Sequence, residues 1–582
     1  MTTGYRVMEK AQTSDWSRRR GLVLGGFACL AIALISRAVY VQVIHEDFYL
    51  NQGQQRQIRT VEIPASRGDL VDRNGDPLAI SAPIPSLFGN PKDMATQPER
   101  IREVAELLGV DAAKLVKRIA TDADRGRVFT YLKRQVDPEV VDKVLALDVK
   151  GVEVMSEYRR YYPSAGAASH VIGFTGIDEN GREGLEMAYD NWLSGETGQR
   201  RIIKDRNGRE IAGMDVIKPS VAGKDLRLSI DRQLQYFANR ALQEAVSKND
   251  AESGSVVIMD VKTGEIMAMA NYPTYNPNDL ADRVGGRQRN RSLTDVFEPG
   301  STMKPFTIAA ALDSGKFKPD DIINTSPGRY QIGKYVISDD GKDNGWLDLT
   351  GIVTKSSNVG ISRVARQLEP EQMWSVLDSF GFGRSPGSEF PGEVAGYFNH
   401  PSLWHHIEQA SISFGYGISV TALQLVRAYA TLANGGVMQP VSFLAQTEVP
   451  QGQRVIDETI ANDVVRMLEA VVEDGSGKQA HIPGYRVAGK TGTSHKSQEG
   501  GYAEDRYVSV FAGFAPVSDP RFAAVVVVHD PKAGTHFGGT VAAPVFADVM
   551  SHGMRLGGIE PDDLDGQREQ VSVQVIQQGE RS

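Results

Sequence analysis

A long apolar segment near the N-terminus, residues 21–44, constrains the fold of this chain more than any other feature. Its uninterrupted part, residues 21–35, is shorter than the ~20 helical residues that cross a bilayer core. The span must therefore continue past Arg37, whose long side chain can extend to the membrane interface. Basic residues dominate before the segment and acidic residues follow it: Arg6, Lys10, Arg18, Arg19 and Arg20, then Glu46 and Asp47. This asymmetry predicts a cytoplasmic tail at 1–20, a transmembrane anchor at 21–44 and an exported body.

A cleaved signal peptide is the alternative for this segment. Residues 18–20 would then be its basic region, and Ser36-Arg37-Ala38 its small-residue cleavage site. We favour an uncleaved anchor because the apolar pattern continues through residues 39–44. In both cases the rest of the chain lies outside the cytoplasm.

The composition excludes several classes of protein. Of 582 residues, 41% are hydrophobic and 24% charged, which is ordinary for a globular protein. The net charge of −9 disfavours a nucleic-acid binder. The single cysteine, Cys29, excludes an intramolecular disulfide, and no HExxH spacing suggests a zinc protease. Among the histidines, we expect His405, His406 and His529 to pack rather than to line an active site.

The sequence pattern of the exported part changes near Ser255. Residues 45–228 are polar and rich in turn signals, with helical patterns at 99–108 and 138–147. Beyond Ser255, two apolar runs around a Lys-Thr-Gly turn predict a β-hairpin. Helical patterns at 302–312, 422–432 and 461–472 precede strand patterns at 507–514 and 522–528. This order indicates an α+β domain at 229–556, an elongated mixed domain at 45–228 and a disordered tail at 557–582.

Three short motifs in the α+β segment carry side chains suited to acyl transfer. Ser301 and Lys304 are three residues apart on one face of a predicted helix, so the amine can act as base for the hydroxyl. Ser356 and Asn358 bring a hydroxyl and an amide to a turn or helix start. In a predicted strand, Lys490 is followed by Thr-Gly-Thr, a cation and two hydroxyls that could hold a carboxylate. Each motif alone has another explanation: chance, helix capping or an exposed strand edge.

The order and spacing of these motifs point to one family. Ser356 lies 55 residues after Ser301, and Lys490 lies 134 residues after Ser356. SxxK, SxN and KTG in this order are typical of penicillin-binding proteins and β-lactamases, and the chain resembles that family closely. Seven further residues resemble the pedestal motifs of class B penicillin-binding proteins: Arg67, Gly68, Asp72, Arg73, Gly75, Gly184 and Glu186. The segments at 81–91, 184–198 and 411–425 most resemble the division-specific transpeptidases of this class.

The resemblance implies a fold and a mechanism. We expect a penicillin-binding transpeptidase domain on a class B pedestal, with Ser301 attacking the penultimate D-Ala carbonyl of a stem peptide. Lys304 would accept the hydroxyl proton, and Ser356 would relay a proton to the departing D-Ala amine beside Lys490. Asn358 would bind the peptide amide. Thr491, Gly492 and Thr493 would bind the terminal carboxylate, and the backbone N–H groups of Ser301 and Thr493 would form the oxyanion hole.

The resemblance also implies partners and a location. The donor is a peptidoglycan stem peptide ending in D-Ala-D-Ala, and the acyl-enzyme is resolved by an amine from a neighbouring stem peptide. β-Lactams mimic the D-Ala-D-Ala terminus and should acylate Ser301. A polytopic glycan polymerase and other division proteins are the expected partners, at the septum and on the outer side of the bacterial inner membrane. No metal, organic cofactor or nucleic acid is implied.

Four hypotheses compete with a septal transpeptidase for this chain. Residues 484–491, GYRVAGKT, match a nucleotide-binding P-loop letter for letter, and a strand pattern ending at Asp530 resembles a metal-binding partner strand. A P-loop, however, needs a buried strand before it and a helix after Lys-Thr, whereas a polar Gly-rich run follows here. The remaining three hypotheses keep the transpeptidase fold: a non-catalytic β-lactam sensor or scaffold, a β-lactamase, and an elongation-type or condition-specific class B transpeptidase.

Overall fold

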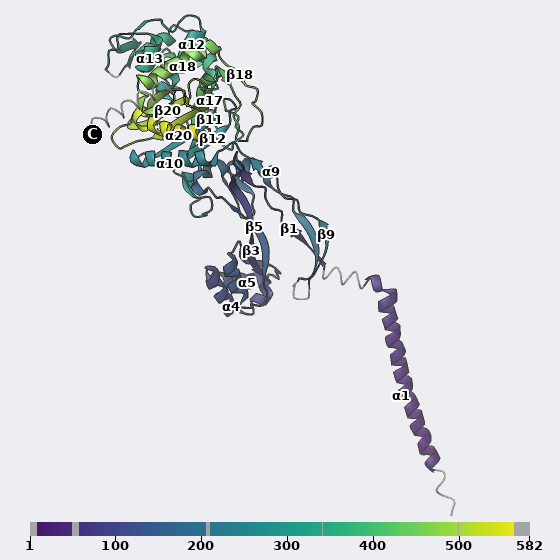
Figure 1. Cartoon of the computed structure of the whole chain (residues 1–582). Coiled ribbons are helices and arrows are strands. Elements are labelled where there is room, and N and C mark those ends of the chain that lie inside the picture. The colour runs from purple at the N-terminus through teal and green to yellow at the C-terminus, as the bar shows by residue number, and fades with distance from the viewer. Residues whose placement is uncertain (1–7, 49–57, 205–209, 340, 499, 564–582) are drawn as a thin grey trace, which may run out of the picture. The chain divides into compact units, whose positions relative to one another are not determined.

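The computed structural model describes residues 8–48, 58–204, 210–339, 341–498 and 500–563 (Figure 1). These residues form two compact units, each assembled from separate segments of the chain. Unit 1 comprises Met1–Ala65, Ile84–Glu157 and Glu196–Val221; unit 2 comprises Ser66–Pro83, Tyr158–Gly195 and Ala222–Ser582. Unit 2 thus contains the segment 229–556 together with parts of 45–228. The boundary that the sequence suggests at 228 stays a prediction.

The N-terminal apolar segment is helical. The helix α1 (Met8–Val39) continues into a π-helical turn, η1 (Tyr40–Ile44). Within the described residues, Trp16–Ile44 is the one helix long and apolar enough to cross a membrane, with a mean hydropathy of 2.2. Its large apolar side chains are exposed, as a lipid-facing helix requires. This helix agrees with a single-pass anchor at 21–44, while residues 1–7 of the predicted cytoplasmic tail lie outside the described residues.

Unit 1 combines an antiparallel sheet with a small helical layer. The sheet has the order β1–β8–β9 (Ile58–Ile63, Gly198–Lys204 and Glu210–Lys218). The helices α3 (Pro91–Met94), α4 (Pro98–Leu108), α5 (Ala112–Asp124) and α6 (Pro138–Leu145) enclose a core with β4 (Thr130–Lys133). Proline stands in the first turn of α4 and α6, where its missing N–H costs nothing, and Gly109 ends α4 in a left-handed conformation. The helices predicted at 99–108 and 138–147 are thereby confirmed.

Unit 2 is built on a five-stranded antiparallel sheet of order β12–β11–β21–β20–β19. The strands are β11 (Ser253–Asp260), β12 (Ile266–Tyr272), β19 (Ala488–Gln498), β20 (Gly501–Ala515) and β21 (Phe522–His529). The predicted hairpin and both predicted late strands are confirmed. Val525 and Val527 join one core cluster and Val526 and Val528 the other, so both faces of the sheet are covered. This explains why β21 reads as an unbroken apolar run.

Helices cover both faces of this sheet (Figure 1). On one face lie α10 (Arg232–Lys248) and α20 (Ala543–Leu556). On the other lie α12 (Lys304–Asp313), α17 (Ala422–Ala433) and α18 (Glu458–Glu473), with α13 (Leu349–Thr354), α14 (Asn358–Ala365), α15 (Pro370–Ser379) and α16 (Glu408–Ser413) near them. The helices predicted at 302–312, 422–432 and 461–472 are confirmed, and so is the α+β class.

Shorter elements complete the two units. The short helices are α7 (Ser169–Ile172), α8 (Gly184–Ala188), α9 (Asp190–Leu193), α11 (Arg291–Thr294) and α19 (Gly538–Val541). The remaining strands are β2 (Leu70–Val71), β3 (Pro77–Gly89), β5 (Val152–Tyr161), β6 (Phe174–Thr175), β7 (Gly181–Glu183), β10 (Leu226–Arg227), β13 (Ile323–Asn324), β14 (Arg329–Ile332), β15 (Tyr335–Ser338), β16 (Trp346–Leu347), β17 (Val437–Met438) and β18 (Gln453–Arg454). β3 pairs with β5, and each of these two strands has residues in both units.

The chain after α20 packs against unit 2 as far as Asp563. The Tyr485 hydroxyl donates to the carbonyl of Ile559 at 2.7 Å, and the backbone N–H of Arg486 donates to Asp562 at 2.8 Å. The packed part therefore extends beyond the expected limit at 556. The rest of the predicted tail, 564–582, lies outside the described residues.

A buried ion network joins two segments of unit 2. The Glu186 carboxylate is fully buried and accepts from Arg67 Nε at 2.7 Å and from Arg160 Nε at 2.6 Å. Arg67 also donates to Asp190 at 2.6 Å. Two of the predicted pedestal residues, Arg67 and Glu186, thus contact each other although 119 residues separate them.

The other pedestal residues shape turns and close contacts within unit 2. Asp72 is buried and accepts backbone N–H bonds at both carboxylate oxygens, one of them from the start of α10. Arg73 lies 3.6 Å from a buried glutamate. Gly75 and Gly184 have φ values of +92° and +62°, which favour glycine. A Cβ on Gly68 would lie 2.1 Å from a backbone carbonyl oxygen, so only glycine fits there.

Candidate active site

Ser301 lies in a tight helical turn that leads directly into α12. The turn, η4 (Gly300–Met303), is 3₁₀, and α12 begins at Lys304. Residues three apart eclipse one another in a 3₁₀ turn, and Lys304 Nζ lies 2.9 Å from Ser301 Oγ. The prediction that these two side chains share one face is confirmed. Pro305 falls in the first turn of α12, where it is tolerated.

Close backbone packing fixes this turn. The buried Tyr429 hydroxyl donates to the carbonyl of Thr302 at 2.9 Å. Gly300 has a φ of +55°, and its N–H donates to the carbonyl of Gly415 at 3.2 Å. A Cβ on Gly492 of β19 would lie 2.7 Å from the carbonyl oxygen of Pro299. Glycine at 492 therefore lets β19 approach the Ser301 turn.

Ser356, in the loop between α13 and α14, contacts Ser301, and Asn358, the first residue of α14, contacts Lys304. Ser356 Oγ donates to Ser301 Oγ at 3.0 Å. Lys304 Nζ donates to the carbonyl oxygen of Ser356 at 2.7 Å and to Asn358 Oδ1 at 2.8 Å. Ser356 has a φ of +58°, a strained value for a residue with a Cβ. Such strain is typical of functional sites, and it turns both the carbonyl and the hydroxyl of Ser356 towards the lysine.

Helix capping explains Ser357 rather than Ser356. Ser357 Oγ accepts from the backbone N–H of Gly360 at 2.8 Å and caps α14. The same hydroxyl donates to Asp339 Oδ2 at 2.6 Å, and Asp339 Oδ1 accepts from the N–H of Val359 at 2.9 Å. Buried Asp339 thus holds the loop that presents Ser356. Sequence reasoning missed it, because nothing distinguishes Asp339 from the neighbouring aspartates of this polar segment, Asp340 and Asp343.

Lys490 lies on β19, at the edge of the sheet, but its side chain is fully buried. Its Nζ donates to Ser356 Oγ at 3.1 Å and to Thr491 Oγ1 at 3.4 Å. Burial lowers the pKa of Lys490 to about 7. The predicted strand is confirmed, and the alternative of an exposed edge lysine is wrong because Nζ points into the site.

The two threonines beside Lys490 have partners of their own. Thr491 Oγ1 lies 2.6 Å from Ser476 Oγ, a residue that the sequence did not single out. Thr493 Oγ1 accepts from the N–H of Gly538 at 3.0 Å, which leaves its hydroxyl hydrogen for another acceptor. The structure thereby brings all three motifs to one place, with Ser301 at its centre.

The structure decides two questions that the sequence leaves open. The P-loop interpretation of 484–491 is wrong, because Lys490 and Thr491 lie within an antiparallel strand and not at the start of a helix. His405 and His406 are exposed, and His529 is buried with its ring 6.3 Å from that of Phe297. His529 therefore packs, as expected, whereas the expectation that His405 and His406 pack is wrong, because both lie on the surface.

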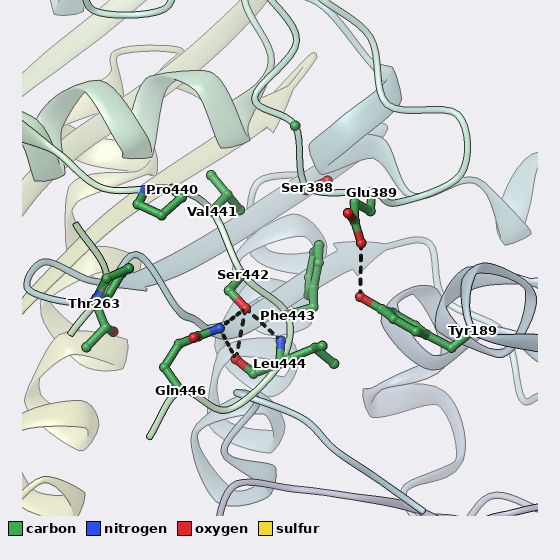
Figure 2. Close-up of a pocket in the computed structure, with 12 residues that line it drawn as sticks. Tyr189, Thr263, Ser388, Glu389, Pro440, Val441, Ser442, Phe443, Leu444 and Gln446 are labelled. Carbon is green, nitrogen blue, oxygen red and sulfur yellow. Dashed lines mark hydrogen bonds between the residues drawn. The ribbon is translucent and has the colours of Figure 1, made fainter. Parts of the chain in front are cut away.

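Two cavities of unit 2 differ in their relation to this site. One, of about 390 Å³, is lined by the motif residue Asn358, by β15 and by residues within 407–417, and its aromatic residues include Tyr416 and Tyr502. The other, of about 210 Å³, is lined by Tyr189, Glu389 and the segment around Ser442, and by none of the motif residues (Figure 2). In this second cavity Tyr189 and Glu389 point towards each other, 3.5 Å apart. Only the first cavity adjoins the Ser301 site.

Comparison with known proteins identifies the family. The sequence model of the penicillin binding protein transpeptidase domain matches residues 254–551, and that of the penicillin-binding protein dimerisation domain matches residues 62–228. Peptidoglycan D,D-transpeptidase FtsI of Escherichia coli is 41% identical over 99% of this chain and 97% of its own length. The probable peptidoglycan D,D-transpeptidase PbpC of Pseudomonas aeruginosa is 40% identical over 93% and 96% of the two chains.

Solved structures agree with these matches. Penicillin-binding protein 3 of Mycobacterium tuberculosis, complexed with aztreonam, has a TM-score of 0.67 and 27% identity over 86% of this chain and 98% of its own. The transpeptidase domain of penicillin-binding protein 3 from Burkholderia pseudomallei has a TM-score of 0.53 and 40% identity over 58% and 97% of the two chains. The chain therefore belongs to the penicillin-binding proteins, as a class B, FtsI-type peptidoglycan D,D-transpeptidase.

Proposed function

We propose that this chain cross-links peptidoglycan stem peptides at the division septum, through an acyl-enzyme on Ser301. The observation that carries the proposal is the position of one amine. Lys304 Nζ lies within hydrogen-bond distance of Ser301 Oγ, Ser356 Oγ and two carbonyl oxygens. A serine with a base at this distance is an activated nucleophile.

The contacts of Lys304 orient its amine, so that in the neutral form the lone pair faces Ser301. The Ser356 carbonyl and Asn358 Oδ1 can only accept hydrogen bonds, so they take two N–H groups of the amine. The remaining tetrahedral position then faces the two hydroxyls. In the neutral amine this position is the lone pair, which can accept the Ser301 proton as the hydroxyl attacks. General-base assistance of this kind is worth ~10²–10⁴-fold in rate.

Ser356 is placed to return the proton. Its hydroxyl lies 3.0 Å from Ser301 Oγ and 3.1 Å from Lys490 Nζ. It would pass a proton to the D-Ala amine as the peptide C–N bond breaks, so that D-Ala departs as a neutral amine. The charge of Lys490 next to this hydroxyl would assist the transfer.

The β19 side of the site suits the carboxylate end of the substrate. Thr491 and Thr493 present hydroxyls beside Lys490, and glycine at 492 allows the strand to lie against the Ser301 turn. The terminal D-Ala carboxylate would bind here. The backbone N–H groups of Ser301 and Thr493 would stabilise the oxyanion, each contributing ~10²–10³-fold. Asn358 would hold the peptide amide of the donor.

The location follows from the anchor and its flanking charges. With the basic segment at 18–20 in the cytoplasm, one helix through the inner membrane leaves the chain after Ile44 outside. Peptidoglycan lies on that side. Further division proteins, including a polytopic glycan polymerase, are proposed as partners on the basis of the family alone.

The test is covalent labelling of the full chain in detergent with a fluorescent penicillin. Wild type should give a label that survives denaturation, and Ser301→Ala should give none. Ser314→Ala, which removes a hydroxyl at the other end of α12, should label like wild type. Wild type and Ser314→Ala should also release D-Ala from a stem peptide ending in D-Ala-D-Ala, and Ser301→Ala should release none. An unlabelled but folded wild type would refute the catalytic assignment.

A second candidate is a condition-specific class B transpeptidase, since the chain is nearly as similar to a relative with another name, PbpC, as it is to FtsI. Depletion of this protein from cells distinguishes the septal role from the condition-specific role. Loss of a septal enzyme should produce filaments without septa, with the protein at midcell beforehand. Normal division after depletion would support the condition-specific role instead.

A further inference from the structure

Glu298, three residues before Ser301, is a half-buried carboxylate whose two oxygens have different surroundings. Oε1 accepts from the backbone N–H of Gly417 at 2.8 Å and from the Tyr502 hydroxyl at 3.0 Å. Oε2 is buried and has no hydrogen-bond partner among the described residues. Burial raises the pKa of Glu298, while the bonds from Gly417 and Tyr502 act in the opposite direction. An unpartnered buried oxygen destabilises a fold, which indicates that the two hydrogen bonds to Oε1 have a role that offsets this cost.

These bonds join three separate elements. Gly417 lies in the loop between α16 and α17, and Tyr502 lies near the tip of the β19–β20 hairpin, paired with Ser497. The backbone carbonyl of Glu298 also accepts from Ser494 Oγ of β19 at 2.7 Å. Glu298 therefore holds the hairpin and the 415–417 loop against its own loop.

A short and closely packed backbone segment connects Glu298 to the nucleophile, Ser301. Only Pro299 and Gly300 lie between them, and Gly300 donates to the carbonyl of Gly415 at 3.2 Å. A Cβ on Gly415 would lie 2.1 Å from the carbonyl oxygen of Gly300. A shift of the Gly417 end of this loop would therefore be passed to the turn that carries Ser301.

The same bonds fix an aromatic wall. The rings of Tyr416 and Tyr502 meet edge to face at 5.5 Å, and the backbone N–H of His495 donates to the Tyr416 hydroxyl at 3.3 Å. Both tyrosines line the 390 Å³ cavity that contains Asn358. Glu298 thus contacts the nucleophile loop on one side and the residues that shape the neighbouring cavity on the other.

We propose that Glu298 is a positioning residue for the acylation step: it sets the place of Ser301 relative to the β19–β20 hairpin and the Tyr416–Tyr502 wall. This inference rests on the proposed function and adds a residue to that same site. The carboxylate makes both Oε1 bonds charge-assisted, hence shorter and stronger than bonds to an amide. Glutamine would keep the acceptor with weaker bonds, and alanine would remove it.

The test separates positioning from folding. In the full chain, the acylation rate constant and the dissociation constant of the initial complex with a fluorescent penicillin are measured for Glu298→Ala, Glu298→Gln, Tyr502→Phe and the double variant Glu298→Ala/Tyr502→Phe. Glu393→Gln is the matched control, because Glu393 also ties a loop through backbone N–H groups, those of Gly387 and Ser388. Thermal unfolding is recorded for all variants.

Misplacing a reacting group by about 1 Å costs ~10²-fold in rate. Glu298→Ala should therefore lower the acylation rate constant by about 10-fold or more, with an unfolding midpoint like that of Glu393→Gln. Glu298→Gln should recover most of the rate. In the double variant, Tyr502→Phe should cause no loss beyond that of Glu298→Ala, because Glu298→Ala already removes the hydrogen bond between Tyr502 and Glu298.

Three results would overturn the inference: normal acylation by Glu298→Ala, a loss confined to the dissociation constant, or single losses that multiply in the double variant. A folded wild type that forms no acyl-enzyme would instead refute the proposed function. The two failures are therefore distinguishable.

Discussion

Replacing Glu186 by glutamine should destabilise unit 2 strongly while adding no bulk. The carboxylate is fully buried, and each oxygen accepts from a different arginine, Arg67 at 2.7 Å and Arg160 at 2.6 Å. The side chains of both arginines are almost fully buried, with 2% and 1% of their surface exposed. In Glu186→Gln one arginine keeps the amide oxygen, and the other faces an NH₂ donor.

The size of the destabilisation depends on which hydrogen-bond partners each arginine keeps in Glu186→Gln. Arg67 keeps Asp190, a backbone carbonyl and Ser194, so its charge stays partnered. Arg160 keeps Ser81, while its Nη2 already has no partner among the described residues, and the nearest other carboxylate, Asp69, is 3.9 Å away. One buried cation is thus left almost without compensation, a change that costs about 3–5 kcal/mol. Since 1.4 kcal/mol is a factor of ten, local opening should increase about 10²- to 10³-fold.

Hydrogen exchange of the full chain measures this change where it occurs. Amides of α8 and α9, at 184–193, should lose protection, and the urea midpoint of unit 2 should fall. Glu196→Gln is the control: it removes the same charge from an exposed pair with Lys218, and it should leave both readouts at their wild-type values. If Glu186→Gln exchanges like Glu196→Gln, the buried network carries no stability and the reasoning from burial is refuted.

Three further predictions concern the site. Because the pKa of Lys490 is about 7, its ammonium is lost as pH rises through 7, and acylation by a carboxylate-bearing penicillin should slow above that pH; a flat rate from pH 6 to 9 would contradict this. Gly492→Ala places a Cβ 2.7 Å from the carbonyl oxygen of Pro299 and should lower the acylation rate at least ~10-fold, measured against the control Gly286→Ala, where a Cβ meets nothing within 4 Å. Asp339→Asn leaves one donor of the Ser356 loop unpaired, which costs about 1–3 kcal/mol, and differential scanning calorimetry should show a lower unfolding temperature.

The sequence predicted the elements whose pattern is local. The hairpin of β11 and β12, the helices α12, α17 and α18 and the late strands each have a periodicity or an apolar run of their own. The roles of Ser301, Lys304, Ser356, Asn358 and Lys490 were inferred from motif order, and the structure brings these side chains within hydrogen-bond distance of one another.

Residues that act only through tertiary contacts left no such signal. Asp339 accepts a hydrogen bond from the N–H of Val359, 20 residues further along the chain, and Glu298 accepts one from Tyr502, which is 204 residues away. Neither stands in a repeat, and either carboxylate could equally lie on the surface. The sequence pattern also did not predict that the Ser301 turn is 3₁₀, since a 3₁₀ turn differs from an α-helical start only in that each hydrogen bond spans three residues instead of four.

Two buried lysines of the site, Lys304 and Lys490, contact the same hydroxyl group. Lys304 and Lys490 each place Nζ 3.1 Å from the same oxygen, Ser356 Oγ, and both side chains are fully buried. Two ammonium groups around one buried hydroxyl would repel each other, and each would lose its hydration. The arrangement therefore favours one neutral amine and one charged one. In the mechanism that we propose, Lys304 is the neutral amine that accepts the Ser301 proton, and Lys490 carries the charge that attracts the terminal carboxylate.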